Sequence, residues 1–328
     1  MIPFDYHRAT SVSDAVTAVA ERPDAVFLAG GTNLVDHMKL GIVEPSLIVD
    51  VSHLSLTDVD QLPDGSLRVG ADVRNSDLAA HPVVRSRYPV LARALLSAAS
   101  GQLRNLATTA GNLLQRTRCV YFQDVTTPCN KRTPGEGCSA IGGYVRYHAI
   151  LGASEHCVAV HPSDMAVAMA ALDTVVVYVD ADGEHRLPLT DFHRLPGDRP
   201  DRDTVLPQGA LITAVEIPVP PKGARSTYRK VRDRASYAFA LTSVAAELVV
   251  DDGTVASARV ALGGVAHKPW RASRAEQELT GAPATEDSFR RAADAELESA
   301  QPLPGNEFKV ELTRRAIVAT LAELTEQR

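Results

Sequence analysis

The chain has few cysteines, few aromatic residues and no long apolar run. No stretch approaches the roughly 20 uninterrupted apolar residues that a membrane-spanning helix needs, so no membrane span is expected. Acidic residues outnumber basic ones, 40 to 34, and no Lys/Arg-rich block occurs, so the net charge of −6 provides no electrostatic footprint for nucleic acid.

The N-terminus lacks a positive n-region and an apolar h-region, which predicts a cytoplasmic chain. Export would then require a twin-arginine signal on a partner.

The remaining composition is that of a folded globular protein. Hydrophobic residues make up 45% and charged residues 23% of 328 residues, which excludes disordered, fibrous and coiled-coil chains. A typical domain has roughly 150 residues, so the length predicts two domains or three small ones.

The four cysteines lie close together in the sequence. Cys119, Cys129, Cys138 and Cys157 fall within 39 residues, in a segment rich in Thr, Pro and Gly that is typical of a loop. An even number of cysteines without a secretory signal favours a metal or redox centre, although the spacing does not choose the metal. The alternatives are four reduced structural thiols or two disulfides.

Basic residues accompany the cysteines. Arg116, Arg118, Lys131 and Arg132 are expected to lower the pKa of the thiols and to offset the negative charge of a cluster with four thiolate ligands.

A first unusual turn follows a short helix (10–21) and a strand (25–28). Gly30 and Gly31 permit close backbone approach, and the next residues can present N–H groups to an anion. The turn is therefore a candidate phosphate cradle, with an ordinary strand-to-helix turn as the alternative.

A second unusual turn follows strands at 46–52 and 66–74 and a helix at 89–100. Residues 104–113 combine small residues, hydroxyls and an amide, as a loop in contact with a polar ligand requires. Loops of this composition also occur without a ligand.

Ser163 and Asp164 begin an apolar helical segment. Ser163 is a plausible N-cap, and Asp164 either supports the first turn or accepts hydrogen bonds from ribose hydroxyls. A hairpin at 174–188 and a strand at 211–219 then predict a mixed sheet.

Residues 219–223, with two prolines and a glycine, predict a domain boundary. A long hairpin (240–250 and 254–264) and an amphipathic terminal helix (306–324) follow. Lys230 and Arg232 lie just after the boundary, either as exposed strand charges, the default, or as cationic contacts for a ligand between domains.

Four segments in chain order, residues 28–34, 107–113, 161–164 and 230–232, resemble the FAD-binding subunit of the molybdenum hydroxylases, which include xanthine and carbon monoxide dehydrogenases. In that family both turns hold the FAD pyrophosphate, the Asp holds a ribose hydroxyl and the Lys lies near the flavin. The resemblance therefore implies FAD-binding roles for Leu28, Ala29, Gly30, Gly31, Thr32, Asn33, Leu34, Thr108, Thr109, Gly111, Asn112, Asp164 and Lys230.

The resemblance also implies an α+β fold. Two α/β subdomains, residues 1–55 and 56–220, would form an FAD-binding domain like that of vanillyl-alcohol oxidase. Residues 221–328 would form a C-terminal α+β domain with an antiparallel sheet and helices.

The cysteine insertion at 115–158 is similar to that of the flavin subunit of bacterial three-subunit aldehyde oxidoreductases. By this resemblance Cys119, Cys129, Cys138 and Cys157 are ligands of a [4Fe–4S] cluster. The flavin subunits of xanthine dehydrogenase and of 4-hydroxybenzoyl-CoA reductase are alternatives.

The resemblance further implies a heteromer in which a large subunit carries the molybdenum cofactor and a small subunit carries [2Fe–2S] centres. Electrons would pass from these centres to FAD and an external acceptor, and no side chain of this chain is expected to be catalytic. Two rival classes are a stand-alone FAD-dependent reductase and a zinc-stapled scaffold protein.

Overall fold

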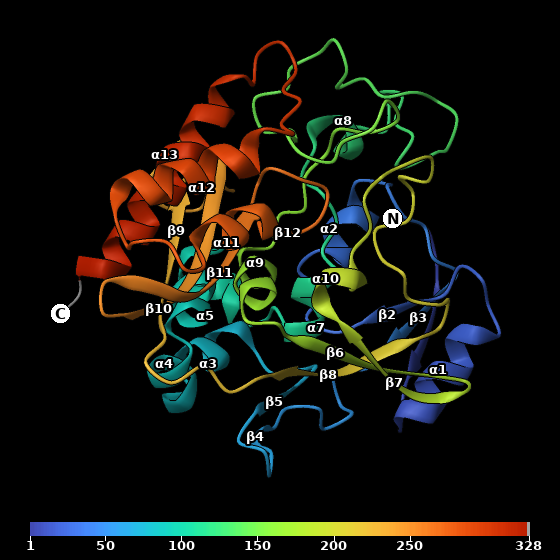
Figure 1. Ribbon diagram of the computed structural model, residues 1–328. Coiled ribbons are helices and arrows are strands. Elements are labelled where there is room, and N and C mark those ends of the chain that lie inside the picture. The colour runs from blue at the N-terminus through green and yellow to red at the C-terminus, as the bar shows by residue number, and fades with distance from the viewer. Residues whose placement is uncertain (327–328) are drawn as a thin grey trace.

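Three β-sheets follow one another along the chain in the computed structural model, which describes residues 1–326 (Figure 1). The first sheet is parallel, in the order β1-β3-β2. Its elements and the two helices beside it are β1 (Asp5–Arg8), α1 (Val12–Ala20), β2 (Val26–Leu28), α2 (Leu34–Lys39) and β3 (Leu47–Asp50).

Helix α1 begins where the sequence predicts. The Ser11 side chain accepts a hydrogen bond from the Asp14 N–H at 3.0 Å, which satisfies one of the unpaired donors of the first turn. The apolar face of the helix, with Ala15, Val16 and Val19 buried, packs against the first sheet and against Leu211 of the second. The first sheet is thereby joined to the second sheet through one apolar cluster.

The second sheet is antiparallel, in the order β4-β5-β8-β6-β7. The mixed sheet expected from the sequence is therefore wrong, because parallel and antiparallel strands belong to separate sheets. Its strands are β4 (Val59–Gln61), β5 (Leu67–Gly70), β6 (Val175–Asp180), β7 (Gly183–Pro188) and β8 (Leu211–Ile217).

The chain between β5 and β8 also forms short helices, and one of them, α9, lies in the core. All eight residues of α9 are buried, which its composition of Ala, Met and Val permits, and Ser163 caps its first turn by accepting from the Ala166 N–H at 2.9 Å. The helices of this region are α3 (Asn75–Ala80), α4 (Pro82–Arg87), α5 (Pro89–Ser97), α6 (Gly101–Arg104), α7 (Thr109–Leu113), α8 (Val120–Gln123), α9 (Asp164–Ala171) and α10 (Leu189–Phe192).

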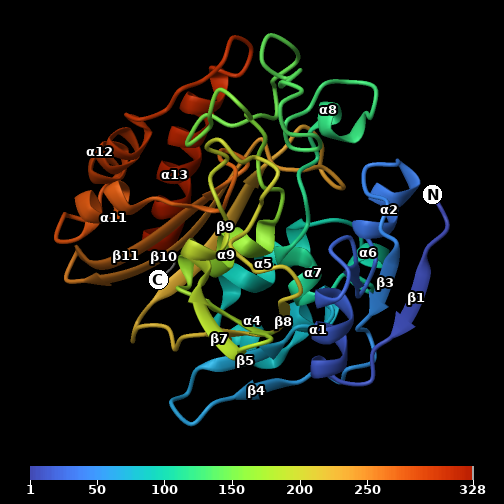
Figure 2. The ribbon, with the colours of Figure 1, turned by 90° about the vertical axis from the view of Figure 1, so that its right-hand side faces the viewer.

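The third sheet is antiparallel, in the order β12-β11-β10-β9, and helices α11, α12 and α13 cover one of its faces (Figures 1 and 2). It contains the long hairpin predicted from the sequence. The elements are β9 (Arg225–Val231), β10 (Thr242–Asp251), β11 (Thr254–Gly263), β12 (Trp270–Arg271), α11 (Ser273–Leu279), α12 (Glu286–Leu297) and α13 (Phe308–Glu326).

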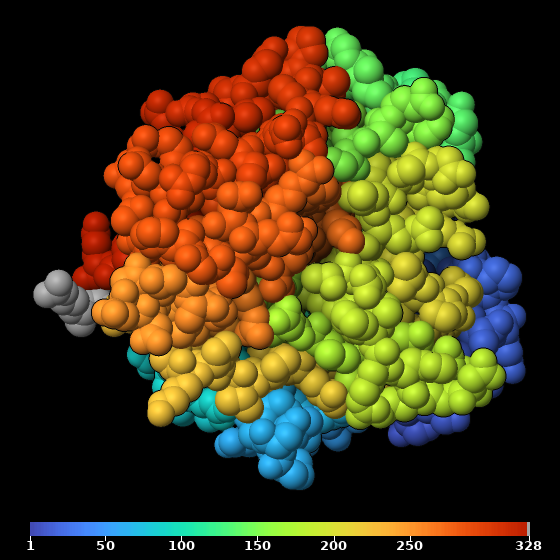
Figure 3. Space-filling view, in the orientation of Figure 1, coloured from blue at the N-terminus to red at the C-terminus, as the bar shows by residue number. Residues whose placement is uncertain are grey.

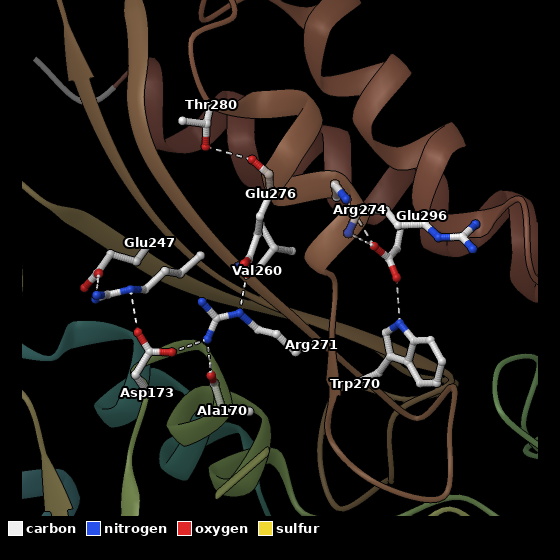
Figure 4. Close-up of polar contacts among 12 residues, drawn as sticks. Ala170, Asp173, Glu247, Val260, Trp270, Arg271, Arg274, Glu276, Thr280 and Glu296 are labelled. Atoms are coloured by element: carbon white, nitrogen blue, oxygen red, sulfur yellow. Dashed lines mark hydrogen bonds and ion pairs between the residues drawn. The ribbon is translucent and has the colours of Figure 1, made fainter. Parts of the chain in front are cut away.

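Charged side chains join α9 to the third sheet. Figure 4 shows Arg271 between Asp173, just beyond α9, and Glu276 of α11. Arg259 of β11 pairs with Asp173 at 2.8 Å and with the buried Glu247 of β10, also at 2.8 Å. The end of α9 is therefore fixed to the C-terminal sheet by a network of ion pairs.

The three sheets and their helices form one continuous body. Figure 3 shows the N-terminal part (blue) and the C-terminal part (red) on opposite sides of the face in view. The division at residues 55 and 220 stays a prediction. Among residues 1–326, no helix is both long and apolar enough to cross a membrane.

Candidate functional site

A cavity of about 1060 Å³ lies where the first turn, the second turn, the start of α9 and β9 meet. Most of the residues singled out from the sequence line it, although they come from distant parts of the chain. Leu28 and Thr109 do not line it, and Thr109 is fully buried. The lining set is Ala29, Gly30, Gly31, Thr32, Asn33, Leu34, Thr108, Gly111, Asn112, Asp164 and Lys230.

The first turn requires its glycines. Gly31 has φ +71°, the left-handed region that other residues rarely adopt. A Cβ at Gly30 would collide with the carbonyl of Leu106, in the second turn. Among the described residues, no protein atom accepts a hydrogen bond from the N–H groups of Gly30, Gly31 or Thr32. The turn therefore presents backbone donors to the cavity, as anion binding requires.

The Asn33 side chain has partners within the protein. Its Oδ1 accepts from the Arg116 N–H at 2.9 Å, and its Nδ2 lies 3.2 Å from His37 Nε2. Asn33 therefore connects the first turn to the start of the cysteine loop.

The second turn is more self-contained than the first. The N–H groups of Thr109, Ala110, Gly111 and Asn112 all donate to protein oxygens, that of Gly111 to Thr108 Oγ1. The Asn112 side chain accepts from Ser163 Oγ at 2.5 Å and from Gln115 Nε2 at 2.8 Å. This turn shapes the cavity wall and links it to the start of α9.

Asp164 and Lys230 form an ion pair in the wall of the cavity. Lys230 Nζ lies 2.7 Å from Asp164 Oδ2, and the side chains are 4% and 5% exposed. Tyr228 donates to Asp164 Oδ1 at 2.5 Å, and burial together with the Asp164 charge raises the pKa of Tyr228 well above its usual value. The default of exposed strand charges is therefore wrong for Lys230, because β9 turns this side chain toward α9.

The sequence reasoning missed two polar residues of this cavity, Asp72 and Asn75. Both are 4% exposed, and Asp72 Oδ2 and Asn75 Oδ1 have no hydrogen-bond partner among the described residues. Burial raises the pKa of Asp72 to about 6. The sequence did contain a signal for Asp72, because this carboxylate lies in a segment, residues 66–74, in which apolar residues alternate as in a half-buried strand. These acceptors, with the free N–H groups of the first turn, fit a ligand that has both phosphates and hydroxyl or amino donors.

The four cysteines converge on a second, small cavity of about 10 Å³. Every one is a free thiol, and Cys129 and Cys138 form an antiparallel bridge between two arms of the loop. Disulfides are therefore not formed. Among residues 1–326, no three His, Cys, Asp or Glu side chains are arranged for a single metal ion.

The expected lowering of the thiol pKa values is wrong for two cysteines. Burial raises the pKa of Cys119 to about 11 and that of Cys157 to about 12, and for Cys157 it outweighs the opposing charge of Lys131. Removal from water disfavours the thiolate unless a ligand stabilises it.

Only one of the four basic neighbours lines the cavity that all four thiols share. Lys131 lines the small cavity, whereas Arg116 and Arg118 line the large one. Arg132 donates to backbone carbonyls of the loop, including those of Tyr121 and Phe122, at 3.1 and 3.0 Å. The basic residues therefore have three different roles.

A large cavity beside a Gly turn with free N–H groups, at the junction of an α/β unit, an antiparallel sheet and an α+β domain, is the arrangement expected of a dinucleotide-binding protein. Comparison with known families agrees with this class. Residues 2–220 match the FAD binding domain in molybdopterin dehydrogenase, and residues 226–324 match the CO dehydrogenase flavoprotein C-terminal domain. The chain belongs to the family of FAD-binding subunits of the molybdenum hydroxylases and is an oxidoreductase subunit.

Individual relatives support the same assignment. The chain is 52% identical to the aldehyde oxidoreductase FAD-binding subunit PaoB of Escherichia coli, over all of both chains. It is 26% identical to the glyceraldehyde dehydrogenase medium chain of Sulfolobus acidocaldarius, over 97% of this chain and 95% of the relative. The carbon monoxide dehydrogenase structure from Hydrogenophaga pseudoflava has the same fold, with a TM-score of 0.78 over 99% of each chain at 24% identity. The expected family and α+β fold class are confirmed.

Proposed function

We propose that this chain is the electron-transfer subunit of a heteromeric molybdenum-containing aldehyde oxidoreductase, and that it carries FAD and an additional [4Fe–4S] cluster. The observation that carries the proposal is the 52% identity to an aldehyde oxidoreductase FAD-binding subunit over the whole chain. The convergence of four free thiols beside the large cavity supports the cluster.

The FAD pyrophosphate is proposed to bind at the first turn. The free N–H groups of Gly30, Gly31 and Thr32 support this placement, because backbone donors in a Gly turn are suited to phosphate oxygens. Asp72 and Asn75 would accept hydrogen bonds from hydroxyl or amino groups of the dinucleotide. Asp164 would face a ribose hydroxyl and Lys230 the flavin, held by their mutual ion pair.

Bound FAD would supply the capacity to accept two electrons and to release them singly or as a pair. The side chains of this chain would bind and orient the flavin and exclude water, and none is assigned a proton-transfer role. Because the molybdenum subunit would oxidise the substrate, the aldehyde specificity would belong to that partner.

The cluster is proposed to bind to Cys119, Cys129, Cys138 and Cys157. A single zinc ion holds its sulfur ligands about 2.3 Å from the metal, which requires close thiols. Thiolates are ligands of both zinc and iron–sulfur clusters, so iron and zinc analysis separates the cluster from the zinc-stapled scaffold. All four cysteines line one small cavity, which is the donor set that such a cluster requires.

The proposed partners are a large subunit with the molybdenum cofactor and a small subunit with [2Fe–2S] centres. Relatives named as a medium chain or FAD-binding subunit support this assembly. We propose a cytoplasmic location, with export of the assembled complex through a partner's twin-arginine signal as the alternative.

The test is cofactor analysis of the complex purified anaerobically after co-expression of the three subunits. We expect one FAD per copy of this chain, and about four irons and four sulfides beyond the [2Fe–2S] content. Cys129→Ser should remove the additional iron, whereas Val125→Ala, at an exposed position of the same loop, should keep it.

The outcomes separate the parts of the proposal. FAD with zinc, or without additional iron, would contradict the cluster and leave the flavin assignment intact. A folded complex without FAD would contradict the proposed function as a whole.

A further inference from the structure

One carboxylate lies between the two cavities. Asp203 Oδ2 accepts from Arg116 Nε at 2.7 Å, and Asp203 Oδ1 pairs with Lys131 Nζ. Arg116 and Asp203 line the large cavity, and Lys131, whose side chain is 1% exposed, lines the thiol cavity. A single side chain therefore holds one cation at each site.

Further contacts make this connection continuous. The Arg116 guanidinium donates to the Lys131 carbonyl at 3.4 Å and lies over the Phe122 ring, 4.7 Å from its centroid. Phe122 is itself part of the thiol cavity wall. At the other end, the Arg116 N–H donates to Asn33 in the first turn. The chain of contacts thus runs from the proposed phosphate cradle to the thiols.

The charges within this chain of contacts depend on one another. Burial alone would raise the pKa of Asp203, but the charges of Lys131 and Arg116 outweigh it and hold this pKa well below its usual range. Two cations repel each other, and a carboxylate that pairs with both offsets this repulsion. A displacement of Arg116 or Lys131 therefore shifts Asp203 and changes the electrostatic field at the other cation.

We propose that Asp203 is a positioning residue that couples the two sites, so that an occupied thiol site strengthens FAD binding and bound FAD alters the reduction potential of the cluster. The inference rests on the proposed function, because it requires both groups to bind. Energetic coupling of two binding sites is reciprocal, so each site reports on the other.

The test is a double-mutant cycle on the assembled complex. FAD is removed, and its dissociation constant is measured by fluorescence titration with Cys129 intact and with Cys129→Ser. We expect Cys129→Ser to weaken FAD binding about fivefold or more when Asp203 is present. In the Asp203→Asn background the same substitution should leave the dissociation constant unchanged.

A redox titration of the cluster, followed by electron paramagnetic resonance, supplies the reciprocal readout. Removal of FAD should shift the midpoint potential in the wild-type complex and should not shift it in Asp203→Asn. Asp203→Glu should restore part of the coupling. If Asp203→Asn does not assemble, Lys131→Gln breaks the same connection from the other end.

Glu216→Gln is the matched control. Glu216 also pairs with two arginines, Arg68 at 2.6 Å and Arg186 at 3.3 Å, but it lines neither cavity, so its removal should leave the coupling intact. Equal coupling in Asp203→Asn and wild type, or a cluster-bearing wild type in which Cys129→Ser leaves FAD affinity unchanged, would overturn the inference. Absence of the additional iron from the wild type would instead refute the proposed cluster.

Discussion

Lys230 Nζ and Asp164 Oδ2 lie 2.7 Å apart, although the two residues are 66 positions apart in the chain. Asp164 begins α9, and Lys230 belongs to β9 of the C-terminal sheet. Because both side chains are almost completely buried, each charge depends on the other for compensation. The wall of the large cavity is therefore built jointly by two parts of the fold.

Lys230→Met should destabilise the chain strongly, by about 3 kcal/mol, because it leaves the buried Asp164 carboxylate without its cation. The loss would be measured by urea unfolding, with the fluorescence of the single tryptophan, Trp270, as the signal. Arg22→Met is the control, since Arg22 also pairs with a carboxylate, that of Asp5, at 2.7 Å but at an exposed position. Its loss should be much smaller. Equal losses would contradict the importance of burial at the Lys230 pair.

Gly31→Ala should weaken FAD binding about tenfold or more. The added methyl group would lie 3.2 Å from Val35 Cγ2 and 3.3 Å from Leu28 Cδ1, so the turn would have to shift. Gly41→Ala is matched, because Gly41 has φ +70° against +71° for Gly31, but it lies outside the cavity and has no atom within 4 Å of the added Cβ. Fluorescence titration of FAD-free protein should show weaker binding for Gly31→Ala alone. A similar loss in both variants would point to general backbone strain.

Asp72→Asn should stabilise the FAD-free chain near neutral pH. The pKa of Asp72 is raised to about 6, so the folded state holds a proton that the unfolded state has already released at about pH 4. The stability contributed by Asp72 is present below about pH 4 and is lost as the pH rises through 6. The gain in Asp72→Asn should therefore be about 2 kcal/mol at about pH 7.5 and vanish below about pH 4. Urea unfolding at several pH values measures it, with the exposed Asp60→Asn as control.

Lys309→Met should remove a pH dependence of stability at alkaline pH. Burial lowers the pKa of Lys309 to about 7, whereas the unfolded chain keeps this proton to about pH 10. Stability should therefore rise between about pH 7 and pH 10 in the wild type, by about 3 to 5 kcal/mol, and this rise should be missing in the variant. Lys222→Met, at an exposed position of the linker, should retain the rise. A parallel pH profile for the two variants would contradict the assignment.

Local patterns predicted much of the fold. The Ser11 and Ser163 caps, the hairpin of β6 and β7 and the long hairpin of β10 and β11 all follow from turn residues, capping residues and hydrophobic periodicity. The two turns that line the large cavity were identified for the same reason, because glycines and small polar residues mark backbone that approaches another group.

Long-range partners were not predictable from such patterns. The position of Lys230 depends on the packing of β9 beside α9, and Asp72 reaches the cavity because its strand ends there. No local pattern marked Asp203, because its two partners, Arg116 and Lys131, are 87 and 72 positions away in the chain. Pairings of this kind are set by tertiary structure, and one sequence contains no direct record of them.

The cysteine loop is held in place by hydrogen bonds from residues at the start of the C-terminal helix, which are synthesised much later than the loop. Lys309 donates to the carbonyls of His148 and Gly264, and Asn306 donates to those of His148 and Ala149. His148 Nε2 in turn lies 3.2 Å from Cys119 Sγ. The partners of the His148 carbonyl are made 158 and 161 residues later, so the last cysteine leaves the ribosome long before the loop can close. The geometry around Cys119 is therefore completed only when almost the whole chain has been synthesised.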